Sequence, residues 1–225
     1  MTWVKICGTT NLRDAELSVA AGANALGFIF APSPRKIEIG EAAAIVHALR
    51  GEVETIGVFV NEMPERLAEM SEQVGLAGVQ LHGDEPAQSL REYRRLLGER
   101  KIIKTLHASD LLRSRNGLAA YLSACDSVDA ILLDSGSARG RGGTGAAFPW
   151  EEALPLAAEI RRGTSLIIAG GLNAENVARA IRLFDPSGVD VVSGVEGSLG
   201  NKDEAKLREF VTAVRQTEPS MTRRK

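Results

Sequence analysis

The chain has 225 residues, of which 44% are hydrophobic and 25% are charged, and its formal net charge at pH 7 is −2. This is the composition of an ordinary globular protein, and the small net charge excludes the strongly basic proteins that bind nucleic acid through charge alone. No apolar run approaches the roughly 18 residues of a membrane helix, and the first residues lack the apolar stretch of a signal peptide. We therefore expect a cytoplasmic protein with no nucleic-acid or membrane partner, in which Cys7 and Cys125 are free thiols.

Short apolar runs typical of β-strands alternate along the chain with amphipathic segments whose spacing is typical of α-helices. The sequence predicts eight strands, which in chain order are Trp3–Cys7, Ala25–Phe30, Thr55–Val60, Gly78–His82, Lys101–Leu106, Ala130–Asp134, Leu166–Ala169 and Val189–Ser193. It also predicts eight helices, at Asn11–Ala21, Gly40–Arg50, Pro64–Val74, Pro86–Leu97, Asp110–Ala124, Trp150–Arg161, Ala174–Phe184 and Asp203–Val214. Helix start signals are present at Asn11, Pro64, Pro86 and Asn173.

The alternation of strands and helices indicates the fold class. Strands without strict polar alternation are typical of sheets covered on both faces, and strands separated by helices pair in parallel. Eight such units predict an α/β protein, a single-domain (β/α)8 TIM barrel. An open doubly wound sheet is the alternative, but here glycine-rich signals follow three late strands rather than only the first. We assign residues 1–215 to the barrel and residues 216–225 to a polar, flexible tail.

Two reactive side chains end predicted strands, Cys7 the first and Asp134 the sixth. The carboxyl ends of barrel strands form the face on which TIM-barrel active sites are built, so both groups are expected at one mouth. Side-chain alternation places Cys7 on the same face as Lys5, and Asp134 on the same face as Leu132. We interpret Cys7 and Asp134 as an acid–base pair, against the simpler alternatives of a small buried thiol and a loop cap.

Glycine-rich loops follow the last three predicted strands, where backbone N–H groups can approach phosphate oxygens closely. They contain Gly142-Gly143-Thr144-Gly145, Gly170-Gly171 and Ser193-Gly194. The last two loops lie where barrels commonly hold phosphate, and we expect a short helical turn within Val195–Gly200 to direct its N-terminus at the anion. Tight turns also use glycine for steric reasons, so the succession of three loops is what predicts a phosphorylated small-molecule substrate.

Arg35 follows the second predicted strand, in a loop where Pro32 and Pro34 limit motion. Its guanidinium provides a fork for a carboxylate, and a solvated arginine is the alternative. Lys5 is expected to point into the barrel, where a lysine needs an acidic partner. We hypothesise that this partner is Asp190, because the eighth strand adjoins the first in a closed barrel.

A set of short motifs runs in order from the first strand to the eighth: Lys5-Ile6-Cys7-Gly8, Ala25-Leu26-Gly27-Phe28-Ile29-Phe30, Ser33-Pro34-Arg35, Gly57-Val58-Phe59-Val60-Asn61, Val79-Gln80-Leu81-His82-Gly83-Asp84, Leu132-Leu133-Asp134 with Gly142-Gly143-Thr144-Gly145, Ala169-Gly170-Gly171-Leu172 and Ser193-Gly194-Val195-Glu196. Together these motifs closely resemble the phosphoribosylanthranilate isomerases over nearly the whole chain. The resemblance implies a barrel of the ribulose-phosphate-binding type. It also implies a reaction that needs no metal and no organic cofactor, since the iminium of the substrate is itself the electron sink.

The resemblance implies isomerisation of N-(5-phosphoribosyl)anthranilate to 1-(2-carboxyphenylamino)-1-deoxyribulose 5-phosphate, an Amadori rearrangement in tryptophan biosynthesis. By the same resemblance Asp134 is the general acid, Cys7 is the general base and Arg35 meets the anthranilate carboxylate. The phosphate would meet the backbone amides of Gly143, Thr144, Gly145, Gly171 and Gly194, within the loops that also contain Gly170 and Ser193. His82 resembles a family residue that shapes the mouth.

A thiol with an ordinary pKa of about 8.5 is mostly protonated at pH 7. We therefore expect positive charge from Lys5 or Arg35 to activate Cys7.

Several alternatives stay open at this point. Arg139 and Arg141 depart from the family pattern, and they either touch the phosphate or are solvated. Another phosphate-binding barrel enzyme, such as an indole-glycerol-phosphate synthase or a histidine-pathway isomerase, would share the last two glycine loops but not a cysteine at the end of the first strand. From a different class, an inactive barrel could bind a phosphorylated metabolite as a sensor. The sequence is compatible with a monomer or a homodimer.

Overall fold

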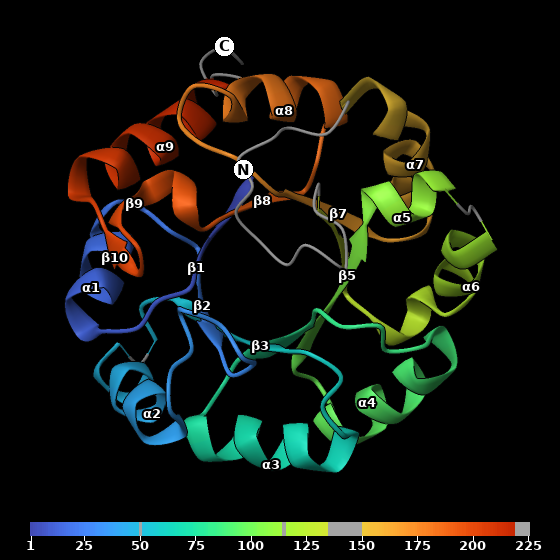
Figure 1. Cartoon of the computed structure of the whole chain (residues 1–225), viewed down its shortest axis with the longest axis horizontal. Helices are drawn as coiled ribbons and strands as arrows, with labels where there is room; N and C mark the ends of the chain where they lie inside the picture. Colours follow the sequence, from blue (N-terminus) through green and yellow to red (C-terminus); the bar gives the residue numbers. More distant parts are fainter. Residues whose placement is uncertain (50, 114–115, 135–149, 219–225) are drawn as a thin grey trace, which may run out of the picture.

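Eight parallel strands close into a barrel in chain order, and the helices ring it on the outside (Figure 1). The computed structural model describes residues 1–49, 51–113, 116–134 and 150–218. The barrel strands are β1 (Trp3–Cys7), β2 (Ala25–Ile29), β3 (Glu54–Phe59), β4 (Gly78–Leu81), β5 (Lys101–His107), β6 (Ala130–Asp134), β7 (Ser165–Ala169) and β8 (Gly188–Val191). Parallel pairing of β1 with β8 closes the sheet and sets Lys5 opposite Asp190. The predicted (β/α)8 barrel is confirmed, and the open-sheet alternative is wrong.

The outer ring consists of α1 (Leu12–Ala20), α2 (Ile39–Ala48), α3 (Pro64–Val74), α4 (Leu90–Leu97), α5 (Ala108–Arg113), α6 (Asn116–Ser123), α7 (Trp150–Gly163), α8 (Val177–Phe184) and α9 (Glu204–Gln216), with short 3-10 turns at η1 (Ala87–Ser89) and η2 (Cys125–Ser127). In Figure 1, α9 lies between α8 and α1 and so completes the ring. Asn11 caps α1 by accepting a hydrogen bond from the backbone N–H of Asp14 at 2.9 Å, and Pro64 begins α3, as the start signals predicted.

Two local predictions are wrong. In place of the single helix predicted over residues 110–124, the described residues form two helices, α5 and α6. The helical turn expected within Val195–Gly200 is instead the 3-10 turn η3 (Ser193–Val195) followed by an antiparallel hairpin of β9 (Glu196–Ser198) and β10 (Asn201–Lys202). The hairpin is favoured because Gly200 has a φ of 79°, a left-handed conformation that suits a tight turn and not a helix.

The strands separate two hydrophobic clusters. The larger cluster lies between the outer face of the barrel and the helices, as expected for strands covered on both faces. The smaller cluster fills the barrel interior and consists of Ala25, Ile56, Ile103, Ala130, Leu132, Ile167 and Ala169, with Trp3 packed against it. Lys5, Cys7 and Gln80 are polar or reactive residues buried among the strands. The barrel therefore encloses these three side chains, toward the carboxyl ends of its strands.

The two ends of the described chain are tied together. Arg215 donates a hydrogen bond to the carbonyl of Thr2 at 2.6 Å, and Glu218 accepts one from the backbone N–H of Thr2 at 2.7 Å. Glu218 belongs to the segment assigned to the tail, and residues 219–225 lie outside the described residues. The division into residues 1–215 and a tail stays a prediction. Over the described residues, no helix has the length and apolar character that crossing a membrane requires.

Candidate active site

Cys7 is the last residue of β1, and its side chain is buried beside Lys5. Gly27 of β2 lies opposite Cys7 in the sheet. A Cβ atom at Gly27 would come within 2.5 Å of the Cys7 Sγ and 3.0 Å of the Lys5 Nζ. The missing side chain of Gly27 therefore makes the space that the thiol and the ammonium group occupy.

Lys5 forms the ion pair that the sequence led us to hypothesise. Its Nζ lies 2.8 Å from the Asp190 Oδ1 and also donates a hydrogen bond to the Gln80 Oε1 at 2.8 Å. Lys5 is fully buried and Asp190 is only 6% exposed, so both charges depend on each other for compensation. The hypothesis that Lys5 pairs with Asp190 across the β1–β8 closure is confirmed.

The charges around Cys7 act in opposite directions. Burial raises the pKa of the Cys7 thiol above its ordinary value, and the positive charge of Lys5 offsets this effect only in part. For Lys5, burial alone would lower the pKa, but the charges of Asp190 and Cys7 outweigh it and raise the pKa. The positive charge that we expected beside Cys7 is present in Lys5, but the lowered thiol pKa is not, because desolvation of the thiol is the larger effect.

Asp134 is the last residue of β6 and lies opposite His107 of β5 in the sheet. Burial raises the pKa of Asp190, the charge and hydrogen bond of Lys5 oppose this effect, and the negative charge of Asp134 adds to it, which places the Asp134 carboxylate within electrostatic reach of Asp190. Cys7 and Asp134 thus end parallel strands of one barrel, and both interact with the Lys5–Asp190 pair. The structure brings the two predicted reactive groups to the same end of the barrel.

Two histidines occupy neighbouring strands at this end. The rings of His82 and His107 pack edge to face with their centroids 5.5 Å apart. Burial, with smaller contributions from the charges of His107 and Lys5, lowers the pKa of His82 to about 4. His82 is therefore neutral at physiological pH, and we expect it to act as a hydrogen-bonding group.

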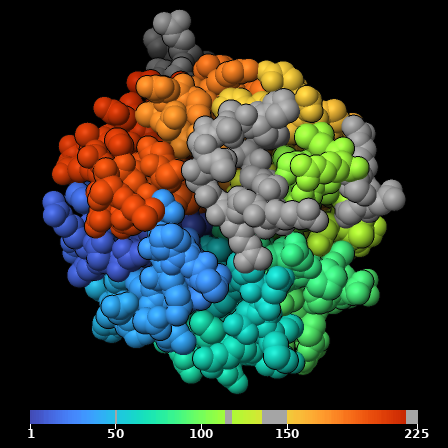
Figure 2. Space-filling view, in the orientation of Figure 1, coloured from blue at the N-terminus to red at the C-terminus, as the bar shows by residue number. Residues whose placement is uncertain are grey.

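Arg35 is held by a residue to which the sequence analysis gave no role. Its Nε and Nη2 donate to the two carboxylate oxygens of Glu196 at 2.7 Å and 2.6 Å. Lys202, in turn, donates to the Cys7 carbonyl at 2.7 Å and lies 3.3 Å from the Glu196 carboxylate. In Figure 2 the blue segment that follows β2 meets the red-orange segment of β9 and β10, the two regions that this cluster joins. A guanidinium has a second edge, so Arg35 retains donors for another carboxylate.

The predicted phosphate loops divide into a described and an undescribed part. Gly143, Thr144 and Gly145, together with Arg139 and Arg141, lie outside the described residues. Gly170 and Gly171 have positive φ angles of 90° and 65° at the end of β7. A Cβ at Gly194 would lie 1.9 Å from the Leu172 carbonyl, so Ser193-Gly194 packs directly against the loop that follows β7. The structure thus brings two of the three predicted loops together.

Other functional candidates were missed because their roles depend on neighbours that are remote in the chain. Gln80 alternates with His82 on one strand face, which was the available signal that both point inward. Glu196 was part of a quoted motif, and a partly buried arginine needs an acidic partner, but its distance from Arg35 in the sequence hid the contact.

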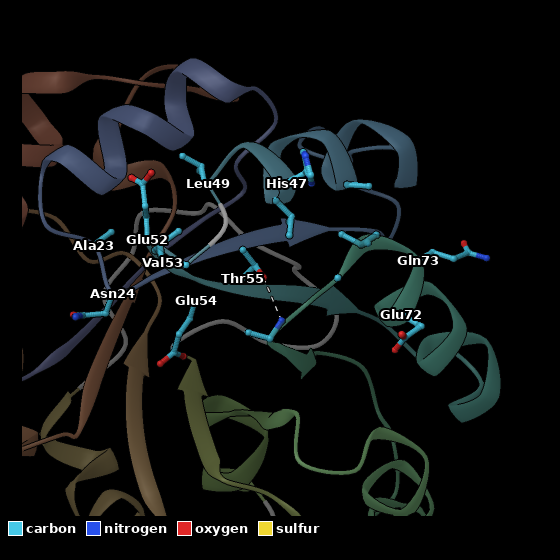
Figure 3. Close-up of a pocket in the computed structure, with 16 residues that line it drawn as sticks. Ala23, Asn24, His47, Leu49, Glu52, Val53, Glu54, Thr55, Glu72 and Gln73 are labelled. Atoms are coloured by element: carbon cyan, nitrogen blue, oxygen red, sulfur yellow. Dashed lines mark hydrogen bonds between the residues drawn. The ribbon is translucent and has the colours of Figure 1, made fainter.

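A cavity of about 820 Å³ lies elsewhere, at the amino ends of the strands (Figure 3). Its lining includes Asn24, Glu54 and Thr55, which lie at or before the starts of β2 and β3, and His47 of α2. Figure 3 shows the hydrogen bond from the Ala77 N–H to the Thr55 hydroxyl at 3.2 Å, which joins the ends of neighbouring strands. Cys7 and Asp134 end their strands, so this cavity is not the candidate active site.

Comparisons with known proteins point to one family. Residues 4–213 match the family model described as N-(5'phosphoribosyl)anthranilate (PRA) isomerase. The chain is 43% identical over 224 residues to N-(5'-phosphoribosyl)anthranilate isomerase from Pelobacter propionicus, covering 99% of this chain and 100% of that protein.

Solved structures agree with the sequence relatives. The fold is similar to the crystal structure of phosphoribosyl anthranilate isomerase from Thermotoga maritima, with a TM-score of 0.81, 38% identity and coverage of 96% of this chain and 100% of that one. It is also similar to a phosphoribosyl anthranilate isomerase in complex with reduced 1-(o-carboxyphenylamino)-1-deoxyribulose 5-phosphate, with a TM-score of 0.80, 37% identity and the same coverage.

Proposed function

The chain belongs to the N-(5'-phosphoribosyl)anthranilate isomerase family, and from that premise we propose which of its residues carry the chemistry. The enzyme isomerises N-(5-phospho-β-D-ribosyl)anthranilate to 1-(2-carboxyphenylamino)-1-deoxy-D-ribulose 5-phosphate, an Amadori rearrangement in L-tryptophan biosynthesis. The observation that most supports an assignment is the position of Cys7 and Asp134, which end strands at the same face of the barrel and both interact with the Lys5–Asp190 pair.

Asp134 is the general acid in this proposal. It donates a proton to the ribose ring oxygen, the C1–O bond breaks, and the anthranilate nitrogen supplies the electron pair that forms the iminium. A carboxylic acid must remain protonated for this step, and a partly desolvated site with a second carboxyl group nearby favours the protonated form.

Cys7 is the general base. Once the iminium has formed, it acidifies the proton on C2, and the thiolate removes that proton to give an enolamine. The enolamine gains a proton on C1 and loses the proton of its C2 hydroxyl, which gives the ketone of the product. The raised pKa of Cys7 makes its thiolate a stronger base once formed, and the positive charge of the iminium favours that thiolate. Lys5 is a supporting residue. Its ammonium group donates hydrogen bonds to Asp190 and Gln80, and its positive charge acts on the sulfur of Cys7.

Arg35 and the glycine loops bind the two charged ends of the substrate. The free edge of the Arg35 guanidinium receives the anthranilate carboxylate, while Glu196 holds the other edge and fixes its orientation. The phosphate meets the backbone N–H groups of the three loops, which contain Gly143, Thr144, Gly145, Gly170, Gly171, Ser193 and Gly194. The close packing of Gly194 against the β7 loop supports a shared cradle.

The test is turnover of freshly generated phosphoribosylanthranilate, followed by the loss of anthranilate fluorescence in the presence of a metal chelator. We expect Cys7→Ser and Asp134→Asn each to lower kcat about 10²- to 10⁴-fold while product-analogue binding persists. Cys125→Ser and Asp126→Asn are matched controls, because both residues lie in η2 away from the mouth. Retention of wild-type kcat by either strand-end variant would remove that residue from the mechanism.

We also propose a cytoplasmic enzyme that acts as a monomer or a homodimer. A related structure is described as mutually generated monomers of a dimeric enzyme from Thermotoga maritima, which supports testing both states. Light scattering across a range of protein concentrations distinguishes them.

A further inference from the structure

A chain of hydrogen bonds crosses the barrel interior beneath the mouth, from β1 to β4 and β5. The Lys5 Nζ lies 2.8 Å from the Gln80 Oε1, and the Gln80 Nε2 lies 3.0 Å from the His82 Nδ1. Thr105 completes a triangle, with its Oγ1 3.1 Å from both the Gln80 Nε2 and the His82 Nδ1. Lys5 is fully buried, and Gln80 and Thr105 are each 1% exposed, so these groups depend on one another for their hydrogen bonds.

Lys5 fixes the direction of the whole chain. An ammonium group has three donors and no acceptor, so the side of the Gln80 amide that faces Lys5 must be the carbonyl oxygen. The NH₂ group of Gln80 then faces His82 and Thr105. A flipped amide would set NH₂ against NH₃⁺ in the buried interior and leave one N–H of each without an acceptor at this contact, which burial makes costly.

The direction of the chain determines where His82 carries its proton. The Gln80 NH₂ donates toward the His82 Nδ1, and the Thr105 hydroxyl, which receives a hydrogen bond from Gln80, has its own proton left for the same nitrogen. With both neighbours able to donate to it, Nδ1 is favoured as the acceptor, and in a neutral imidazole the proton is then on Nε2. The lowered pKa of His82, about 4, agrees with a neutral ring.

We propose that Lys5 and Gln80 are positioning residues that hold His82 as the neutral imidazole protonated on Nε2. His82 is partly exposed at the end of β4, so this arrangement gives the mouth one fixed hydrogen-bond donor that is not an acid. The inference rests on the proposed function in one respect: the acceptor for this donor is an oxygen of the phosphorylated sugar. Asp134 then remains the only general acid in the mechanism, because neutral His82 donates a hydrogen bond from Nε2 but does not transfer that proton to the sugar.

The tautomer can be observed directly. Protein labelled with ¹⁵N at its histidines gives long-range ¹H–¹⁵N correlations that distinguish a protonated from an unprotonated ring nitrogen. The chain has three histidines, and loss of one set of signals in His82→Gln assigns those of His82. We expect a protonated Nε2 and an unprotonated Nδ1 at pH 7. A protonated Nδ1, in either a neutral or a charged ring, would overturn the proposal.

Variants at Gln80 and Thr105 test the cause. Gln80→Glu has the same shape but only acceptors, so we expect the Nδ1 of His82 to gain a proton. Thr105→Val removes one donor to Nδ1 but keeps Gln80, so it serves as the matched control in which the Nε2–H form persists. An unprotonated Nδ1 in Gln80→Glu would show that the amide does not set the tautomer. The wild-type spectrum tests the proposal independently of whether a variant folds.

The kinetic consequence separates this inference from the assignment of acid and base. We expect Gln80→Glu to lower kcat/KM at least about tenfold, because one substrate hydrogen bond is lost and a carboxylate is placed beside Lys5. If Cys7→Ser and Asp134→Asn silence the enzyme but His82 has the other tautomer, only this inference fails. If the tautomer is as expected but those variants remain active, only the catalytic assignment fails.

Discussion

Lys5 and Lys104 are two lysines of equal burial that serve different parts of the molecule. Their side chains are 0% and 1% exposed, and each forms an ion pair at 2.7–2.8 Å. Burial alone would lower the pKa of Lys5, but the charges of Asp190 and Cys7 together outweigh desolvation and raise it. For Lys104, desolvation prevails over the attraction of Glu85 and lowers the pKa. The Lys5–Asp190 and Lys104–Glu85 pairs each join a strand lysine to an acidic residue, and they differ in the groups that surround them.

The difference follows from the strand face on which each lysine lies. Lys5 points into the barrel toward Cys7, whereas Lys104 lies next to Ile103, which points inward, and so faces the helices. Lys104 donates to the Gly83 carbonyl at 2.7 Å and lies over the ring of Tyr121, while Glu85 also accepts from the Asn61 N–H. In the proposed mechanism the inner pair therefore acts on the chemistry, whereas the outer pair holds the loop that follows β4.

The largest expected effect separates chemistry from stability at the inner pair. Lys5→Met leaves Asp190 buried without its partner, which should cost about 3–5 kcal/mol in the free energy of unfolding. The double variant Lys5→Met/Asp190→Asn should recover most of that stability. Its kcat should stay about tenfold or more below wild type, because the charge beside Cys7 is gone. Denaturant unfolding and turnover are measured together. Recovery of kcat along with stability would make Lys5 purely structural.

The outer pair should show the opposite combination. Lys104→Met leaves Glu85 buried without its partner, which should cost about 3–5 kcal/mol in the free energy of unfolding. Adding Glu85→Gln keeps an acceptor for the Asn61 N–H and removes the unpaired charge, so stability should largely return. In both variants kcat of the folded enzyme should stay within a few-fold of wild type. A large kcat loss in the stable double variant would contradict the division between the pairs.

His82 gives the inner region a pH dependence on the acidic side. The pKa of His82 is about 4 in the folded protein, below the ordinary 6.5, so between these values the unfolded chain binds more protons. Stability should therefore fall as the pH drops from 6.5 toward 4, by at most about 3 kcal/mol from this residue. Measuring the free energy of unfolding of wild type and His82→Gln at each pH isolates the contribution of His82. The titratable neighbours His107, Lys5, Asp190 and Lys104 are unchanged in that variant. Parallel pH curves for the two proteins would show that His82 does not titrate in this range.

Gly27 tests how tightly the inner region is packed. In Gly27→Ala the new methyl group meets the Cys7 Sγ and the Lys5 Nζ, so overpacking should cost about 1–3 kcal/mol. Displacement of the thiol should lower kcat more than it raises KM. Gly40→Ala is the matched control, because a Cβ there has no neighbour within 4 Å. Equal kinetics for Gly27→Ala and the control would mean that Cys7 tolerates the shift.

The smallest effect is expected at the surface. Lys36 and Glu38 form an ion pair at 2.8 Å with side chains 45% and 71% exposed. Lys36→Met should change the free energy of unfolding by less than about 1 kcal/mol, because water screens exposed charges. Thermal unfolding at low and high salt measures this, and a loss comparable to that of Lys104→Met would mean that burial is not what distinguishes the pairs.

The sequence predicted the strands well because each is a short apolar run bounded by turn residues. β1, β6 and α3 begin and end where the apolar pattern does. It failed at Val195–Gly200, where an extended hairpin replaces the expected helical turn, because Gly200 supports a turn that local composition alone did not reveal. The Lys5–Asp190 pair was predictable because closure of the barrel makes the first and last strands neighbours.

By itself, the sequence determined the eightfold alternation, the strand ends that carry Cys7 and Asp134 and the motifs of the family. These are local properties, set by periodicity and residue type within a few residues of chain. Only the tertiary structure decided that Glu196 holds Arg35, that Gln80 links Lys5 to His82, and that burial outweighs Lys5 at the Cys7 thiol. Such contacts and pKa values depend on which charges and how much water surround a group in space, and no short stretch of sequence contains that information.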